Sequence, residues 1–288
     1  MIPGRDGAQI RDLLQRGFYS MAFQPVRETA NSRPYGFEAL LRGPLATPLA
    51  NPQKLFHERP YLDLALLLDL DMACLGAALR SGRVFASSVK LFINVHGATL
   101  HNIVDCQGDL LDLLKEVHVH PSRLVLEISE STDSESLSHI AASLPLLKAM
   151  GIQIALDDVG GSFPWLDHLL WLEPDYLKLD HSLVHDLHAS LRKQRLIRSL
   201  CDMALNAGAQ CIAEGIETPE DWRAVCDLDV PYAQGFWLGR PCPARDWLRG
   251  DRPGMGSTGV AAVYESSCIE QDGGSFHDHK QDSGGRGL

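Results

Sequence analysis

Residues 151–158 read GIQIALDD, in which a mostly apolar run from Ile152 to Leu156 leads directly into two adjacent carboxylates, Asp157 and Asp158. A short apolar run is typical of a β-strand that is buried on both faces, as the strands of a parallel sheet are. Two like charges at the end of such a strand are costly to bury unless something compensates them. The stretch therefore indicates a strand that delivers paired acids to a site.

Other stretches of this kind alternate along the chain with longer amphipathic patterns, which is typical of a parallel sheet wrapped by helices. Strands are expected at 21–26, 35–41, 89–95, 123–128, 152–157, 175–179, 209–214 and 232–238. Helices are expected at 61–80, 109–117, 134–149, 183–206 and 219–226, where apolar residues recur every three or four positions. Eight strands predict an α/β fold with a closed TIM-type (β/α)8 barrel, which needs roughly 250 residues.

The composition agrees with one globular domain. The chain has 288 residues, of which 45% are hydrophobic, and a formal net charge of −11, which argues against binding to a nucleic acid polymer or an anionic membrane. Seven scattered cysteines without a CxxC pair, and the absence of a signal-like or membrane-spanning run, predict a cytoplasmic protein. Residues 1–250 are expected to form the barrel, and the Gly- and Ser-rich residues 251–288 a flexible tail.

Polar residues recur near the ends of the expected strands. They are Glu38, Asn94, Glu127, Asp157, Asp158, Lys178, Asp180, Glu214 and Gln234. In an α/β barrel the carboxyl ends of the strands form one rim, where active sites lie. Each residue alone would be read as a helix cap or a surface ion pair. Because they recur in phase, we expect them to converge on one pocket.

Several carboxylates and an amide oxygen in one buried pocket require cations. Hard oxygen ligands suit magnesium or manganese, and Asp157 could bridge two ions. Two such ions can clamp a phosphodiester and generate hydroxide, so phosphodiester hydrolysis is the leading reaction. The histidines 181, 185 and 188 have helical spacing, but no acids lie in register with them, which argues against a metal site there.

The motifs resemble, in order, those of the EAL domain family, which is named after residues that match Glu38-Ala39-Leu40. They are FQPV (23–26), EALLR (38–42), FINV (92–95), LEISE (126–130), ALDD (155–158), DYLKLD (175–180), AEGIET (213–218) and QGFWLGRP (234–241). The resemblance extends from about residue 8 to residue 248. An unrelated metal-dependent barrel, such as an enolase-like lyase, would not predict this motif order.

The resemblance implies a phosphodiesterase that opens cyclic di-GMP, a bacterial second messenger, into linear pGpG with two Mg2+ or Mn2+ ions. The metal ligands would be Glu38, Asn94, Glu127, Asp157, Asp158 and Glu214. Lys178, Glu38 and Gln234 would be catalytic, with Lys178 beside the attacking water and Gln234 supporting that water. The substrate contacts would be Gln24, Leu40, Arg42, Asp180 and Glu217, and Glu130 would brace the loop after the fifth strand.

That loop departs from the family pattern. Family enzymes usually continue the paired aspartates as Phe-Gly-Thr-Gly-Tyr-Ser-Ser, whereas residues 157–166 read DDVGGSFPWL. The departure leaves a second hypothesis open, in which a catalytically weak or inactive protein acts as a receptor for cyclic di-GMP or binds a protein partner. A homodimer or a partner protein could contact residues 159–165.

Overall fold

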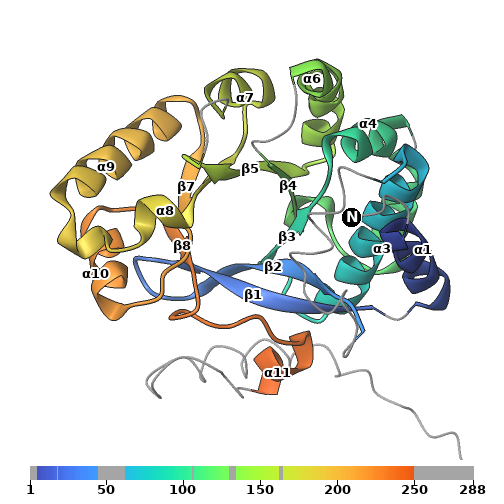
Figure 1. The fold of residues 1–288 in the computed structure, drawn as a ribbon, viewed down its shortest axis with the longest axis horizontal. Helices are drawn as coiled ribbons and strands as arrows, with labels where there is room; N and C mark the ends of the chain where they lie inside the picture. The colour runs from blue at the N-terminus through green and yellow to red at the C-terminus, as the bar shows by residue number, and fades with distance from the viewer. Residues whose placement is uncertain are drawn as a thin grey trace, which may run out of the picture. The chain divides into compact units, whose positions relative to one another are not determined.

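Eight strands close into one barrel in chain order, from β1 to β8, in a computed structural model that describes residues 5–17, 19–44, 62–105, 107–129, 134–161 and 165–249 (Figure 1). This confirms the predicted barrel. The strands are β1 (Ser20–Glu28), β2 (Pro34–Arg42), β3 (Lys90–Asn94), β4 (Leu124–Ser129), β5 (Gln153–Val159), β6 (Tyr176–Leu179), β7 (Gln210–Ala213) and β8 (Tyr232–Gln234). The tail expected from residue 251 lies outside the described residues, so it stays a prediction.

The first strand runs against the others. β1 pairs antiparallel with both β2 and β8, whereas the pairs from β2 to β8 are parallel, so the expected all-parallel sheet is wrong for β1. Residues 29–33 are too few for a crossover helix, which needs roughly a dozen residues, and they make a hairpin instead. Ser32 has a φ of 60°, and its backbone N–H donates to the Glu28 carbonyl. The strand expected at 232–238 is also shorter, since β8 ends at Gln234.

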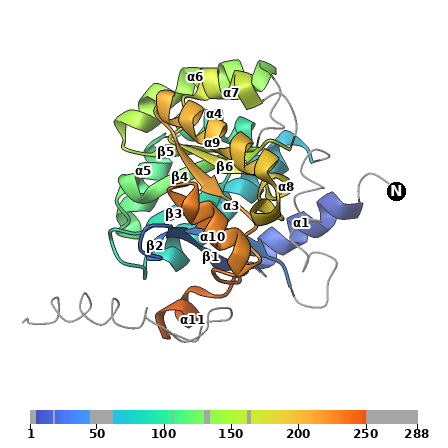
Figure 2. The same ribbon diagram turned by 90° about the vertical axis from the view of Figure 1, so that its left-hand side faces the viewer.

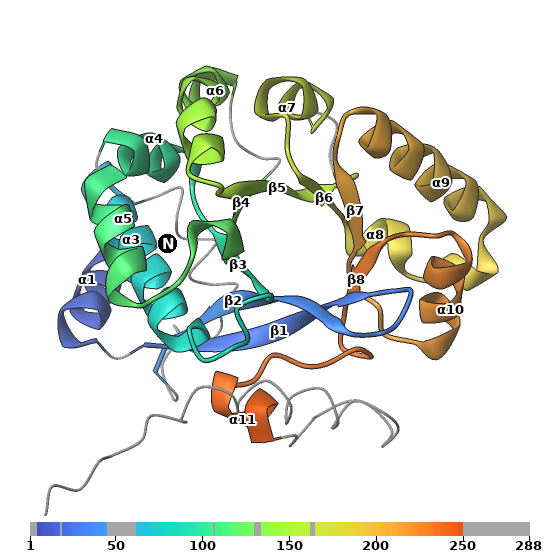
Figure 3. The same cartoon turned by 180° about the vertical axis from the view of Figure 1, so that it is seen from behind.

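Helices surround the barrel wall (Figures 1 and 2). They are α1 (Arg5–Arg16), α3 (Leu64–Gly82), α4 (Gly97–Asp105), α5 (Gln107–Glu116), α6 (Ser134–Ala149), α7 (Trp165–Leu172), α8 (His181–Val184), α9 (Leu191–Asn206), α10 (Pro219–Asp227) and α11 (Ala244–Arg249). α11 lies beside β1, where the Trp247 indole N–H donates to the Phe23 carbonyl at 2.7 Å. As seen from behind in Figure 3, α3 and α9 lie on opposite sides of the barrel.

The single helix expected at 183–206 is interrupted. It is divided into α8, a short 3-10 helix at Leu187–Ala189, and α9. Asp186 adopts a left-handed conformation with a φ of 55°, which ends the first segment, and the Ser190 side chain caps α9 by accepting from the Lys193 backbone N–H. The apolar periodicity survives this break, so periodicity alone did not reveal it.

Two layers of apolar side chains hold the barrel. The large layer lies between the strands and the helices, while a small cluster inside the barrel contains Phe92, Val125, Ala155, Tyr176 and Ile212 among its buried members. Tyr176 is the first residue of β6, so this cluster fills the end of the barrel where the parallel strands begin. Lys178 lies two residues further along and points inward as well. The interior therefore changes from apolar to polar or charged side chains along the strands that contribute to this cluster.

Candidate metal centre

Lys178 is the centre of the ionic end of the barrel. Its Nζ lies 2.8 Å from Glu127, 2.9 Å from Asp157, 2.9 Å from Glu214 and 3.6 Å from Glu38, and its side chain is 1% exposed. These acids come from four different strands or strand ends. The barrel thus brings together residues as far apart in the chain as Glu38 and Glu214, which are 176 positions apart.

Amide side chains orient two of the acids. Asn94 Nδ2 donates to Glu38 Oε1 and to Glu127 Oε2, at 3.0 Å each. Gln234 Nε2 donates to Glu38 Oε2 and, at 3.2 Å, to Gln24 Oε1. Gln24 is held in turn by donating to the Gly239 carbonyl at 3.2 Å. Because both carboxylate oxygens of Glu38 accept hydrogen bonds, its side chain has one orientation.

The charges of this cluster do not balance. Four carboxylates face one ammonium group, so burial raises the pKa of Glu127 well above its usual range, with Glu38 and Asp157 adding to the rise and Lys178 opposing it. Burial also raises the pKa of Glu214, to about 8, and Asp157 and Glu38 contribute again. Burial alone would lower the pKa of Lys178, but the acids outweigh burial and raise it. Lys178 is therefore an ammonium ion, and the acids around it lack positive charge.

A bulge at the end of β5 places both aspartates of the quoted stretch at the mouth. Adjacent residues of a regular strand point to opposite faces. The pairing of β5 with β6 shifts register between Leu156 and Val159, and Asp158 has a φ of 61°, which aspartate tolerates better than most residues. As a result, metal-binding atoms of Asp157, Asp158 and Glu214 lie within 4.8 Å of one another.

These residues fit divalent ions that prefer oxygen ligands. Asp157, Asp158 and Glu214 offer carboxylate oxygens at the spacing of one coordination sphere. No donor among the described residues reaches the buried Gln234 Oε1, which leaves an acceptor for a bound water. Four acids surround the single ammonium group of Lys178, so bound metal ions would reduce the repulsion among the carboxylates.

The expected substrate contacts are less uniform. Arg42 at the end of β2 is partly buried, and burial lowers its pKa while nearby Glu38 raises it. Leu40 is partly exposed on the same strand. The Asp180 carboxylate accepts from the Ser182 N–H and caps α8, whereas Glu217 is exposed just before α10. Glu130 and residues 162–164 lie outside the described residues. The substrate and bracing roles of all these residues stay predictions.

Asp71 is a buried acid that was not among the site residues predicted from the sequence. Its Oδ2 accepts from the His96 backbone N–H and from Thr99 Oγ1, at 2.7 Å each. It thereby fixes the chain directly after Asn94. The two aspartates of the leucine-rich helix α3, Asp69 and Asp71, were the available signal, because a carboxylate is buried there only with partners.

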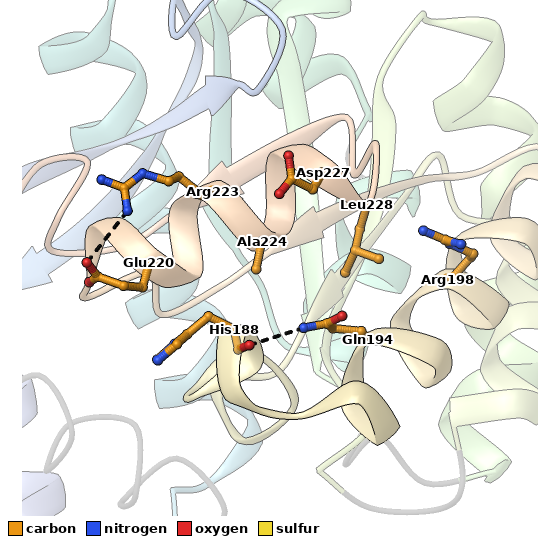
Figure 4. A pocket seen from close by; sticks show the side chains of 8 residues that line it. All are labelled: His188, Gln194, Arg198, Glu220, Arg223, Ala224, Asp227 and Leu228. Atoms are coloured by element: carbon orange, nitrogen blue, oxygen red, sulfur yellow. Dashed lines mark hydrogen bonds and ion pairs between the residues drawn. The ribbon is translucent and has the colours of Figure 1, made fainter.

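A second group with metal-binding atoms within 4.8 Å consists of Asp186, His188 and Asp221. His188 lies at a groove of about 360 Å3 between α9 and α10 (Figure 4). Asp221 Oδ1 accepts from the His188 backbone N–H at 3.1 Å and from its Nδ1 at 2.8 Å, and Oδ2 accepts from Thr218 at 3.0 Å. Both oxygens are thus engaged, and the group is a brace between two loops. No local pattern in the sequence indicates this contact, because Asp221 lies 33 positions from His188.

A family model described as the EAL domain matches residues 8–241. The chain belongs to the EAL domain family.

Curated relatives and solved structures share this domain. The chain is 29% identical over 248 residues to the probable cyclic di-GMP phosphodiesterase PdeN of Escherichia coli, and the match covers 85% of this chain and 48% of PdeN. It is 29% identical over 217 residues to the blue light- and temperature-regulated antirepressor BluF of the same organism, with 74% of this chain and 52% of BluF covered. The chain thus spans about half the length of these relatives.

The complex of Klebsiella pneumoniae BlrP1 with calcium and cyclic di-GMP is a similar solved structure. It has a TM-score of 0.69 and 27% identity, and the match covers 85% of this chain and 59% of BlrP1. A complex of the same protein with manganese and cyclic di-GMP at pH 9.0 has a TM-score of 0.69 and 28% identity, and the match covers 79% of this chain and 57% of BlrP1. Among the described residues, no helix is both long and apolar enough to cross a membrane.

Proposed function

We propose that this EAL domain hydrolyses cyclic di-GMP to linear pGpG with two Mg2+ or Mn2+ ions. The observation that carries the proposal is the buried Lys178 ammonium inside a set of four carboxylates, next to the grouped oxygens of Asp157, Asp158 and Glu214. The names of PdeN and of the BlrP1 complexes support the substrate, and the complexes support a divalent ion. A cytoplasmic location, and a dimer or partner at residues 159–165, stay predictions.

The ligands of the two ions would be the six metal residues expected from the sequence: Glu38, Asn94, Glu127, Asp157, Asp158 and Glu214. Bound there, the ions would supply a hydroxide nucleophile at neutral pH and positive charge near the phosphate. Lys178 would lie beside the attacking water, where its Nζ, already 2.8–2.9 Å from Glu127, Asp157 and Glu214, would orient that water and offset negative charge. The Gln234 Oε1 accepts a hydrogen bond from the same water. Arg42 contacts a phosphate oxygen.

Purified protein incubated with cyclic di-GMP and Mg2+ or Mn2+ should therefore produce linear pGpG, resolved by chromatography. Glu38→Ala removes a ligand whose orientation Asn94 and Gln234 fix, and turnover should fall at least about 100-fold. Calcium should bind but support little turnover, because its bonds are longer and its coordination is looser. Glu173→Ala, an exposed acid paired with Lys148, is the matched control and should keep full activity. Near-native turnover of Glu38→Ala would overturn the site.

A receptor is the second candidate function. Two observations favour it: the altered residues 159–165, and the similarity to BluF, whose name describes an antirepressor. Replacing residues 159–165 by Phe-Gly-Thr-Gly-Tyr-Ser-Ser should raise turnover at limiting Mg2+ by about tenfold, or roughly 1.4 kcal/mol of barrier, if the native loop limits catalysis. If parent and graft both bind cyclic di-GMP in calorimetry but release no pGpG, the protein is a receptor.

A further inference from the structure

Two cysteines face each other on the side of the barrel, away from the acids around Lys178. Cys201 lies on α9 and is partly exposed, while Cys211 lies on β7 and is buried. The strand alternation turns Cys211 outward, because the next residue, Ile212, belongs to the small cluster inside the barrel. Both cysteines thus meet in the layer between α9 and the barrel wall.

The pair opens onto a surface cavity. Cys201 and Cys211 line a cavity of about 320 Å3 together with Arg198 and Asp202. A water molecule occupies about 30 Å3 of liquid, so the cavity can admit a peroxide, which is little larger. Both cysteines therefore line a space that a peroxide can enter.

The two thiols are chemically unequal. A side-chain hydrogen bond between the two thiols lowers the pKa of Cys201, and the same bond, together with burial, raises the pKa of Cys211. Cys226 offers a comparison: it is also partly exposed, but burial raises its pKa, and its Sγ contacts the Thr29 carbonyl at 3.9 Å. Cys201 is partly exposed whereas Cys211 is buried, so a peroxide meets the Cys201 sulfur first, and a lowered pKa favours the thiolate that attacks it.

We propose that Cys201 and Cys211 form a peroxide-reactive dithiol site, in which Cys201 is oxidised first and Cys211 closes a disulfide bond. The inference is independent of cyclic di-GMP hydrolysis. A reducing cytosol favours the dithiol, so the disulfide would form transiently, as regulatory disulfides in that compartment do.

The reaction balances with hydrogen peroxide as the oxidant. The Cys201 thiolate attacks one peroxide oxygen, the O–O bond breaks, and the leaving hydroxide takes a proton to become water, which leaves a sulfenic acid on Cys201. The Cys211 sulfur then attacks the Cys201 sulfur, the S–O bond breaks, and the departing hydroxide takes the Cys211 proton. Two thiols and one peroxide thus give one disulfide and two waters.

Peptide mass spectrometry tests the site directly, because no Lys or Arg separates the two cysteines. Trypsin releases residues 199–223 as one peptide that contains both. After peroxide treatment and alkylation of the remaining thiols, this peptide should carry no alkyl group and be lighter by two hydrogen atoms. Cleavage after Met203 should leave its halves joined until a reductant is added. The thiols of this peptide should be lost at least about tenfold faster than that of Cys226.

Variants identify the order of the steps. Cys211→Ser should leave a sulfenic acid on Cys201 that a dimedone probe traps, whereas Cys201→Ser should leave Cys211 reduced. Cys226→Ser is the matched control and should form the disulfide as the parent does. The mass of the peptide 199–223 is measured on the unmodified sequence, so the test still holds if one of the variants folds poorly. Equal oxidation of Cys226, a bond from Cys201 to Cys106 or Cys268, or over-oxidation without a bond would overturn the proposal.

Discussion

At the scale of single residues, Lys178 explains how the acids can lie so close together. The alternation of β6 places Leu177 and Leu179 in the outer apolar layer and Lys178 inside, where its ammonium group meets acids from four strands. The cation compensates part of the repulsion, and the remainder calls for metal ions. Lys178 thus compensates charge in the barrel, and in the proposed reaction it would also lie next to the attacking water.

Replacing Lys178 separates chemistry from binding. If Lys178 donates to the attacking water, Lys178→Ala should lower turnover at least about 100-fold while cyclic di-GMP affinity changes only a few-fold. Product assays and calorimetry on the same preparation measure the two effects. Lys148→Ala, which removes an exposed ion pair with Glu173, is the control. Equal losses in turnover and affinity would instead make Lys178 a phosphate anchor.

At the scale of elements, the loops after the strands are tied to one another, and these ties position the site. The loop after β7 meets the loop after β8 at Gly235, where the Ile216 N–H donates to the Gln234 carbonyl at 3.0 Å. The brace of His188 and Asp221 joins the loop after β6 to α10, which follows the β7 loop. Gln234 and Glu214, at the ends of neighbouring strands, thus depend on shared loop packing.

Gly235 should not tolerate a side chain. A Cβ at Gly235 would lie 2.2 Å from both the N and the O of Ile216, and backbone atoms cannot move aside without breaking the loop. Gly235→Ala should therefore destabilise the protein by about 2 kcal/mol or more in urea denaturation. Gly7→Ala in α1 is the matched control, because the added Cβ would make an ordinary 3.7 Å contact with Leu66 of α3. Unchanged stability of Gly235→Ala would refute the close approach.

The His188–Asp221 brace predicts a pH-dependent stability. The hydrogen bond to Asp221 raises the pKa of His188 in the folded protein above its unfolded pKa of about 6.5. The stability that this interaction contributes is therefore fully present below about pH 6.5, and it is lost as the pH rises through the folded-state pKa. Asp221→Asn should therefore lower the melting temperature more at pH 6 than at pH 9. Asp227→Asn, an exposed acid on the same helix, should show no such difference. If Asp221→Asn lowered the melting temperature equally at pH 6 and pH 9, the predicted titration of His188 would be contradicted.

At the scale of the whole molecule, a metal centre would join strands that the backbone already pairs. The expected ligands come from β2, β3, β4 and β5 and from the end of β7, so an ion bound to the folded barrel alone stabilises all of them together. The small cluster inside the opposite end of the barrel does not depend on charge, because its members are apolar or aromatic; Phe92 and Tyr176, for example, pack edge to face with their ring centroids 5.5 Å apart. The apolar cluster that stabilises the barrel and the candidate metal site thus lie at opposite ends of the barrel.

Manganese should consequently raise the melting temperature. An ion present at 100 times its dissociation constant stabilises by about 2.7 kcal/mol, or roughly 5–10 °C for a domain of this size. Calorimetry with and without Mn2+ measures this shift, and Asp157→Asn should remove most of it. Asp112→Asn, which alters an exposed pair with Lys115, should keep it. A full shift in the Asp157 variant would place the ion elsewhere.

Much of the fold was predictable because apolar alternation marks buried strands, and the strand positions expected from the sequence match those found to within a few residues, except at β8. The hairpin between β1 and β2 was missed because residues 29–33 were read only as a gap between strands. The break at Asp186 was missed because a left-handed residue leaves no mark on apolar periodicity.

By itself the sequence determined the barrel, the family and the set of acids, since these depend on local pattern and on motif order. Only the tertiary structure decided how the acids are arranged. The bulge that turns Asp157 and Asp158 to one mouth, and the contacts of Lys178 with acids from four strands, arise when the barrel closes. Closure brings together residues far apart in the chain, and a sequence does not encode such distances in any one segment.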